Sequence, residues 1–324
     1  MLSTESLLQR IEEKAATIGL SQEPRSLYEP VHYSMSLGGK RVRPLLALMA
    51  CNLFTDAIDP AVNPALGLEV FHNFTLLHDD LMDRSEKRRG HPTVYRKWNE
   101  NTAILSGDAM LIQAYQLIAD TDKRLLPEII RLFSQTALEV CEGQQYDMDF
   151  ETETNISADN YLHMIRLKTA VLLACALKTG AIIGGATAAD TGTLYEFGIN
   201  IGIAFQLRDD YLDVYGDQSV FGKNIGGDIL CNKKTALLVK ALELANEPQK
   251  EQLYAWLNRT EYDPAEKISA VTAIYNELHI KEETEQQIDH FFGQAQQQFA
   301  KLPVEPGRTT ILQQYVTGLM KRDL

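Results

Sequence analysis

The sequence has no run of about 18 apolar residues, so no segment is expected to span a membrane. Its first twenty residues contain acids and no long apolar core, which is unlike a secretory signal peptide. Cysteine is scarce, and none lies in a CxxC pair or at zinc-site spacing from a histidine. The sequence therefore predicts a cytoplasmic protein with reduced core thiols at Cys51, Cys141, Cys175 and Cys231.

Basic residues are also few. The 31 lysines and arginines are outnumbered by 44 aspartates and glutamates, which gives a net charge of −13. Nucleic acids and anionic membranes bind basic surfaces, so neither is an expected partner. An acidic balance fits a chain whose carboxylates hold cations.

Strand-like alternation is nearly absent, and no segment has the pattern of a βαβ unit. Helical spacing of apolar residues runs through most of the 324 residues, and no low-complexity linker divides them. The sequence predicts an all-α fold of ten or more helices in one domain over residues 1–324. The predicted helices include 43–54, 64–83, 157–185 with Ser157 as N-cap, 193–217, and four further helical patterns within 233–322.

Two acidic motifs end apolar helices. "DDLMD" contains Asp79, Asp80 and Asp83, and "DDYLD" repeats the spacing. Positions four residues apart share a helix face, so each motif projects carboxylates in one direction. Clustered carboxylates repel unless a cation lies between them, and Mg²⁺ prefers such oxygen ligands together with substrate phosphates. The candidate metal ligands are Asp79, Asp80, Asp83, Asp209, Asp210 and Asp213.

Basic residues stand beside both motifs in an otherwise acidic chain. Arginine binds phosphate oxygens in a fork and lysine acts as a point charge, so the arrangement favours a bound diphosphate. His72 lies seven residues before Asp79, on the same helical stripe. The cations are Lys40, Arg41, Arg43, Arg88, Arg89, Lys168, Lys223, Lys233 and Lys234.

Simpler interpretations exist for each feature taken alone. One DDxxD motif is a weak signal, because acids are common near helix ends. His72 could be a hydrogen-bonded core histidine, and Lys168 could be a surface lysine. Two motifs at the same spacing, each followed by glycine and basic residues, are harder to explain by chance.

The chain resembles the trans-isoprenyl diphosphate synthases, or polyprenyl synthetases, as a short-chain member. The resemblance rests on both aspartate motifs and on "GGKRVRP", "RRG", the "KT" at 168–169, "FQLRDD" and "GKNIGGDI…NKKT", in family order from about residue 25 to 240. The remaining C-terminal quarter matches only as helices. The family implies an all-α bundle around a deep central cavity.

The resemblance also implies roles for individual residues. The two motifs would hold three Mg²⁺ ions, with Asp209 as the main ligand of the second. Arg88, Lys168 and Lys233 would contact the allylic diphosphate. Isopentenyl diphosphate would be bound by Lys40, Arg43, His72 and Arg89. The catalytic residues would be Lys168, Thr169, Gln206 and Lys223, which line the reacting zone.

The implied activity belongs to isoprenoid biosynthesis. A prenyltransferase of this kind condenses isopentenyl diphosphate with an allylic diphosphate (C5–C15) by metal-assisted ionisation, attack of the isopentenyl double bond, and proton loss. Water would quench the carbocation, so a dry apolar site is expected. The expected product is farnesyl or geranylgeranyl diphosphate.

A bulky residue just before the first motif acts in this family as a floor that limits chain growth. Phe74 and Phe71 lie roughly 7 Å and 12 Å before Asp79 along a helix of 1.5 Å rise per residue. Thr75 beside Phe74 leaves some space. The predicted floor is therefore Phe71, Phe74 and Thr75. Only two residues separate the aspartate pair from the last aspartate, where many bacterial farnesyl enzymes have four, so both products remain open.

Two other functions remain to be weighed. A terpene cyclase would share the fold, but cyclases replace the second motif and lack an isopentenyl diphosphate site. A non-catalytic or regulatory subunit of a heteromeric prenyl synthase normally loses one aspartate motif, and here both are intact. The family usually forms homodimers, so a homodimer is expected.

Overall fold

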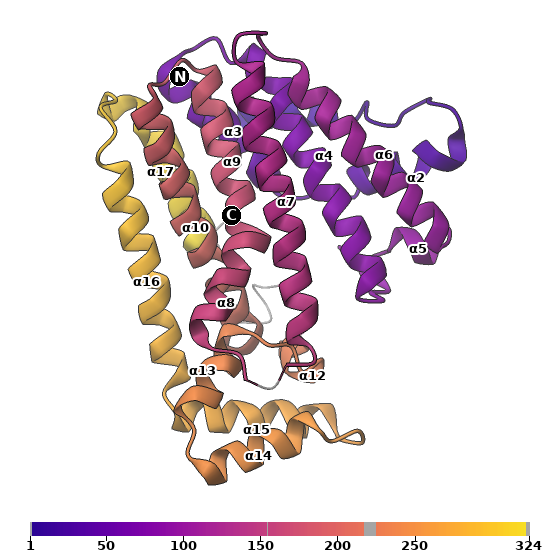
Figure 1. Cartoon of the computed structure of the whole chain (residues 1–324), viewed down its shortest axis with the longest axis vertical. Coiled ribbons are helices and arrows are strands. Elements are labelled where there is room, and N and C mark those ends of the chain that lie inside the picture. The colour runs from indigo at the N-terminus through magenta and orange to yellow at the C-terminus, as the bar shows by residue number, and fades with distance from the viewer. Residues whose placement is uncertain (1, 154, 217–224, 322–324) are drawn as a thin grey trace. The chain divides into compact units, whose positions relative to one another are not determined.

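The computed structural model describes residues 2–153, 155–216 and 225–321. This part of the chain is mainly helical (Figure 1), and its strands are β1 (Lys87–Arg88) and β2 (His91–Pro92), which form one antiparallel hairpin. The predicted all-α fold of ten or more helices is confirmed. The helices are α1 (Thr4–Ala15), α2 (Arg25–Ser36), α3 (Val42–Phe54), α4 (Asp59–Met82), α5 (Val94–Lys97), α6 (Glu100–Ala119), α7 (Leu126–Phe150), α8 (Ala158–Ile165), the π-helix η1 (Arg166–Ala170), α9 (Val171–Ile183), α10 (Ala188–Tyr215), α12 (Gly227–Leu230), α13 (Ala236–Leu244), α14 (Glu247–Leu257), α15 (Pro264–Glu277), α16 (Ile280–Phe299) and α17 (Pro306–Lys321).

The observed helix boundaries largely follow the sequence signals. Ser157 is the N-cap of α8, and its side chain accepts a hydrogen bond from the backbone N–H of Asn160. The predicted helix 157–185 is divided by η1. Residues 236–321 form five helices rather than the four predicted patterns, partly because Asn246 and Gln249 make a capping box that starts α14 directly after α13.

The chain forms two compact units. Unit 1 contains residues 1–135, 172–195 and 302–315, and unit 2 contains residues 136–171, 196–301 and 316–324. The helices α7, α10 and α17 each contribute residues to both units. The expectation of a single domain over residues 1–324 stays a prediction.

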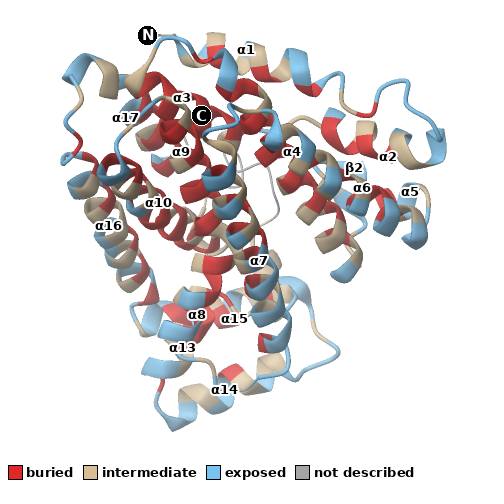
Figure 2. Cartoon of the chain, turned by 45° about the horizontal axis from the view of Figure 1, so that its top comes forward, coloured by how far each residue is buried: buried red, intermediate tan, exposed pale blue. Residues whose placement is uncertain are grey.

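The core of unit 1 is built on α3 and α4, which are buried along most of their length (Figure 2). α4 packs along α6, and a Cβ added to Gly67 would lie 2.6 Å from a carbon of Ile118. A Cβ at Gly180 would similarly overlap the backbone of Ala47 on α3. These glycines therefore allow neighbouring helices to approach closely, which fixes the position of α4 and its aspartates.

Unit 2 has a similar close packing around η1. A Cβ at Gly143 of α7 would overlap the backbone of Lys168, and a Cβ at Gly202 of α10 would overlap Ala170. An apolar cluster in this unit contains residues of each helix from α12 through α16, with Leu237, Leu253 and Tyr275 among its buried members. η1 is thus held between α7 and α10.

Within the described ranges, no helix is both long and apolar enough to cross a bilayer. The expectation of core thiols is correct for Cys51 and Cys175, which are buried, but wrong for Cys141 and Cys231, which are exposed. Cys141 lies on an outer face of α7, and Cys231 follows the short helix α12.

Candidate active site

The first aspartate cluster lies where α4 ends. Asp79 and Asp80 are in its last turn, and Asp83 is the C-cap. The negative end of the helix dipole lies at the same place, so three carboxylates there cost stability unless cations balance them. Arg88 of β1 supplies one such charge, with its Nε 2.9 Å from both Asp80 oxygens and its Nη2 3.7 Å from Asp79 Oδ2. Arg88 therefore balances part of the negative charge at the end of α4.

The three carboxylates differ in accessibility. The Asp80 side chain is only 6% exposed and is held by Arg88, whereas the Asp79 side chain is 21% exposed and Asp83 is an exposed residue. Burial raises the pKa of Asp80, and the hydrogen bonds from Arg88 oppose that rise. Asp80 is therefore committed to Arg88, whereas Asp79 and Asp83 are more accessible, and their role as metal ligands stays a prediction.

The hairpin after α4 presents the two arginines of "RRG". Arg89 and Gly90 both adopt positive φ, which turns the chain between β1 and β2. Thr93 closes the base of the hairpin by donating its hydroxyl to the backbone carbonyl of Ser85 at 2.8 Å. Arg89 reaches the loop before α3, where its Nη1 donates to the carbonyl of Gly38.

Unit 1 also gathers the predicted isopentenyl diphosphate residues. Lys40 is exposed on the loop before α3, and Arg43 and His72 are partly buried on α3 and α4. Burial lowers the pKa of Arg43 to about 10, while the carboxylate of Glu69 opposes the shift. Burial also lowers the pKa of His72 well below 6.5, and Arg43 and Arg89 lower it further. His72 is therefore neutral at pH 7 and can donate one hydrogen bond to an anion.

Arg41 does not join this group. The sequence grouped it with the phosphate-binding cations, but its side chain is 2% exposed and pairs with Glu12 and Glu69. It is a buried structural residue, described further below.

In unit 2, the π-helix η1 carries Lys168 and Thr169. A π-turn inserts an extra residue into a helix and is common at functional sites. Lys168 Nζ donates to Asp147 Oδ2 of α7 at 2.6 Å. Thr169 Oγ1 donates to Gln206 Oε1 of α10 at 3.1 Å. The π-turn thus places adjacent residues against two different helices.

The same network continues into the second aspartate motif. Gln206 Nε2 donates to Asp210 Oδ1 at 3.0 Å, Tyr161 donates its hydroxyl to Asp210 Oδ2, and the backbone N–H of Ala236 lies 3.1 Å from Oδ2. Burial raises the pKa of Asp210, and these donors oppose the rise. Asp210 is only 2% exposed. Like Asp80, it is committed to neighbouring donors, whereas Asp209 and Asp213 are more accessible to solvent.

The segment after α10 adds another carboxylate. The backbone N–H of Asp228 donates to Asp213 Oδ2 at 3.0 Å, and burial together with Asp213, Asp210 and Asp209 raises the pKa of Asp228 to about 7, against the effect of Lys233. Lys233 is an exposed residue at the end of this turn. Lys223, the remaining predicted catalytic residue, lies outside the described residues.

The fully buried Lys267 of α15 supports this turn. Its Nζ donates to Asn232 Oδ1 at 2.6 Å and to the carbonyl of Leu230 at 3.4 Å. Asn232 is a left-handed residue directly before Lys233. α15 therefore helps to hold in place the turn that precedes Lys233.

The predicted chain-length residues lie on α4. Phe71 is 1% exposed and packs edge-on against Phe133, and Phe74 is 9% exposed with its ring centroid 5.5 Å from that of Phe71. Thr75 is partly exposed, and its hydroxyl donates to the carbonyl of His72 at 2.8 Å. These contacts form a stack of bulky groups one to two turns before Asp79.

Sequence reasoning did not identify Glu69, Asp147, Tyr161 or Asp228. Asp228 is the aspartate of the quoted "GGDI" pattern, so the sequence could have identified it as a candidate site residue. The other three contact Arg41, Lys168 and Asp210 through tertiary packing alone, and no spacing in the sequence points to them.

The described carboxylates fit Mg²⁺ by chemistry. They are hard oxygen donors in clusters that oppose the helix dipole, although no group of three or more candidate ligands in the described part of the chain is already arranged as a complete metal site. Mg²⁺ takes few protein carboxylates and fills its remaining positions with water and substrate oxygens.

Comparisons with known proteins define the class and then the family. The fold matches a crystal structure of a geranylgeranyl pyrophosphate synthase with a TM-score of 0.94 at 44% identity, covering 99% of both chains. It also matches the geranylgeranyl pyrophosphate synthetase of Pyrococcus horikoshii with a TM-score of 0.92 at 30% identity, covering 98% of this chain and 97% of the other. The architecture is therefore that of the all-α prenyl synthases.

The family model "Polyprenyl synthetase" matches residues 24–277. The short chain isoprenyl diphosphate synthase of Methanothermobacter thermautotrophicus is 38% identical over 250 residues, 77% of this chain and 76% of its own. The geranylgeranyl diphosphate synthase of Methanosarcina mazei is 40% identical over 223 residues, 68% of each chain. The protein belongs to the polyprenyl synthetase family and is a prenyltransferase, and the match extends beyond the predicted limit near residue 240.

Proposed function

We propose that this prenyltransferase condenses isopentenyl diphosphate with an allylic diphosphate and releases geranylgeranyl diphosphate. The observation that carries the proposal is the placement of carboxylates in the last turns of both α4 and α10, where each helix dipole opposes them. Cations stabilise acids in this position, and a magnesium diphosphate would supply further positive charge. The longer of the two expected products is favoured because relatives at 37–40% identity are named geranylgeranyl diphosphate synthases.

Different residues are proposed to bind each of the two substrates. Arg88 of β1 is the proposed ligand of the allylic diphosphate in unit 1, and the same role for Lys168 and Lys233 stays a prediction from the family motifs. Lys40, Arg43, His72 and Arg89, all of unit 1, bind isopentenyl diphosphate. Asp79 and Asp83 at the end of α4, and Asp209 and Asp213 of α10, would hold Mg²⁺. Asp80 and Asp210 orient Arg88, Gln206 and Tyr161. That both aspartate clusters act on one diphosphate stays a prediction.

When bound, Mg²⁺ stabilises the charge that develops on the departing diphosphate. Arg88 adds fixed positive charge as the allylic C–O bond breaks and its electron pair goes to the diphosphate, and the same contribution from Lys168 stays a prediction. The isopentenyl double bond then forms the new C–C bond. Thr169 and Gln206 line the site of the reaction, and the proton lost from the isopentenyl unit passes to the released diphosphate.

We propose that two copies of the chain form a homodimer through an apolar surface of unit 1. Ile104, Leu105 and Ile112 of α6 are 44%, 60% and 61% exposed. Leu105 and Ile112 are seven residues apart and therefore share a helix face. An apolar stripe of this kind on a helix is suited to burial against the same stripe of a second copy. A cytoplasmic location stays a prediction.

Product analysis tests the function directly. The purified chain is incubated with Mg²⁺, isopentenyl diphosphate and each of the C5, C10 and C15 allylic primers. Geranylgeranyl diphosphate is expected from all three, since each primer is an intermediate on the way to it. Diphosphate release without isopentenyl diphosphate would instead indicate a terpene cyclase, and an inactive chain would favour the regulatory-subunit alternative.

A further inference from the structure

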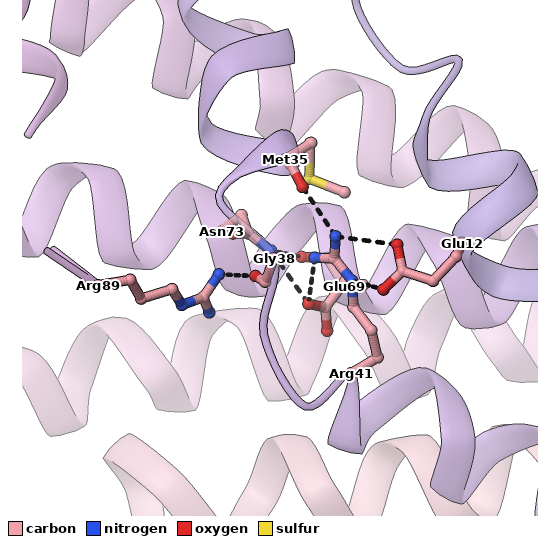
Figure 3. Close-up of polar contacts among 7 residues, drawn as sticks. All are labelled: Glu12, Met35, Gly38, Arg41, Glu69, Asn73 and Arg89. Carbon is pink, nitrogen blue, oxygen red and sulfur yellow. Dashed lines mark hydrogen bonds and ion pairs between the residues drawn. The ribbon is translucent and has the colours of Figure 1, made fainter. Parts of the chain in front are cut away.

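A buried ion pair lies beneath the loop that carries Lys40. Arg41 and Glu69 have side chains only 2% and 3% exposed, and Arg41 Nη1 lies 3.1 Å from Glu69 Oε1 (Figure 3). Arg41 Nη2 also donates to the carbonyl of Met35 at 2.8 Å, and its Nε donates to Glu12 Oε1 at 2.9 Å. Buried charges are tolerated only with partners of this kind, so the position of Arg41 is strongly determined.

The backbone at Arg41 depends on these contacts. Arg41 is the N-cap of α3 and adopts a left-handed conformation with φ of 47°, which is unfavourable for a residue with a side chain. Lys40 precedes it directly, and Arg43 follows in the first turn of α3. Fixing Arg41 therefore fixes the chain between two of the proposed diphosphate ligands.

Arg89 holds the other end of the same loop. Figure 3 shows its guanidinium reaching the Gly38 carbonyl, to which Nη1 donates. Gly39 has φ of 134°, and a Cβ there would lie 2.8 Å from Arg89 Nη2. The loop therefore lies between a contact to Arg89 and the buried contact to Glu69.

Glu69 connects this loop to α4. It precedes His72 by three residues on the same helix, and its Oε1 also accepts a hydrogen bond from Asn73 Nδ2 at 3.2 Å. Its negative charge acts on Arg43 and Arg89 as well as on Arg41. One buried carboxylate thus pairs with Arg41 and also acts on Arg43 and Arg89.

We propose that Glu69 is the positioning residue of the isopentenyl diphosphate site. Through Arg41 it holds residues 38–43 in the conformation in which Lys40 and Arg43 receive the diphosphate. Its charge also balances the arginines while the site holds no diphosphate. The inference rests on the proposed function, and it assigns Glu69 no direct contact with substrate.

The test is Glu69→Gln, with Glu12→Gln as its matched control. Both remove one carboxylate from Arg41, but the Glu12 side chain is 45% exposed, so water can replace it. We expect E69Q to raise the KM for isopentenyl diphosphate about tenfold or more, with kcat and the allylic KM changed less than about threefold. E12Q is expected to leave all three constants within about twofold of the unmodified enzyme.

A rise in the KM for isopentenyl diphosphate alone distinguishes positioning from general destabilisation. A merely structural role would lower the melting temperature without affecting one substrate more than the other. An isopentenyl diphosphate KM unchanged in E69Q, or both KM values raised equally, would overturn the inference. If E69Q does not fold, Arg41→Lys gives the same test, since one ammonium cannot satisfy the partners of the guanidinium fork. Failure of both variants to fold would show the pair to be a folding requirement instead.

Calorimetric titration with isopentenyl diphosphate separates this inference from the proposed function. If the unmodified enzyme forms no product with any primer, the function fails. If it binds isopentenyl diphosphate and E69Q binds equally well, the function stands and the role of Glu69 is refuted.

Discussion

His72 shows how single residues respond to the charge around them. Burial lowers its pKa well below 6.5, and the positive charges of the neighbouring Arg43, Arg89, Arg88 and Arg41 lower it further. The folded protein therefore keeps His72 neutral at a pH where the unfolded chain protonates it. Because the unfolded state then binds more protons, stability must fall as the pH drops below about 6.5.

His72→Gln should remove this dependence. Urea unfolding at about pH 7.5 and pH 5.5 should show the unmodified protein losing up to about 1 kcal/mol more stability than the variant. At the higher pH no such difference is expected from protonation. Equal losses in both proteins would mean that His72 titrates normally in the folded state.

Phe74 is the residue expected to limit product length. Replacing it with alanine removes a ring that packs on Phe71 and His78 before the first aspartate cluster. Phe74→Ala should lengthen the product by one or more isoprene units, measured by mass spectrometry, and should cost about 3 kcal/mol of stability. Phe197→Ala, which removes a buried ring against Phe299 in unit 2, should destabilise without lengthening the product. An unchanged product in the Phe74 variant would remove the floor assignment.

At the scale of single elements, the π-turn of η1 is the feature most sensitive to packing. Gly143→Ala would push a methyl group into the backbone of Lys168. We expect a loss of about 1–3 kcal/mol in stability and about 100-fold in kcat, because Lys168 and Thr169 are displaced together. Gly192→Ala is the control, since its Cβ would meet nothing within 4 Å. If G143A retains full kcat, the π-turn is not needed for catalysis.

Sequence patterns predict these elements unevenly. The local apolar run gives α3 to within one residue, and Ser157 correctly marks the start of α8, but α4 and α10 each begin five residues before the predicted 64–83 and 193–217. No local signal predicts η1, whose extra residue depends on close contact with Gly143 and Gly202. The position of a helix can therefore be read from its own residues, but a distortion within it depends on distant ones.

The candidate site shows the same limit. The motifs correctly identify which residue types gather at the ends of α4 and α10, but not which side chain turns inward. Arg41 has the same charge as Arg43 and lies two positions away, yet only Arg41 is enclosed by Glu12 and Glu69. Likewise, Asp80 and Asp210 differ from their motif neighbours only in the donors that tertiary packing brings to them.

At the scale of the whole molecule, the proposed homodimer makes a clear prediction. The exposed apolar stripe of α6 is the surface expected to be buried between copies. Two carboxylates introduced by Leu105→Glu and Ile112→Glu would have to lose their hydration there without a partner, which is more costly than the lost apolar contact alone. The double variant should therefore be a monomer by light scattering, whereas the unmodified chain should be a dimer.

Leu244→Glu provides the matched control, because Leu244 is also an exposed apolar residue, at 47%, but lies on α13 of unit 2. It should remain a dimer. Dilution should lower the melting temperature of the unmodified protein and of this control but not that of the double variant, since only a dimer gains stability with concentration. A monomeric unmodified chain, or a double variant that stays dimeric, would mean that α6 is not the surface where two copies meet.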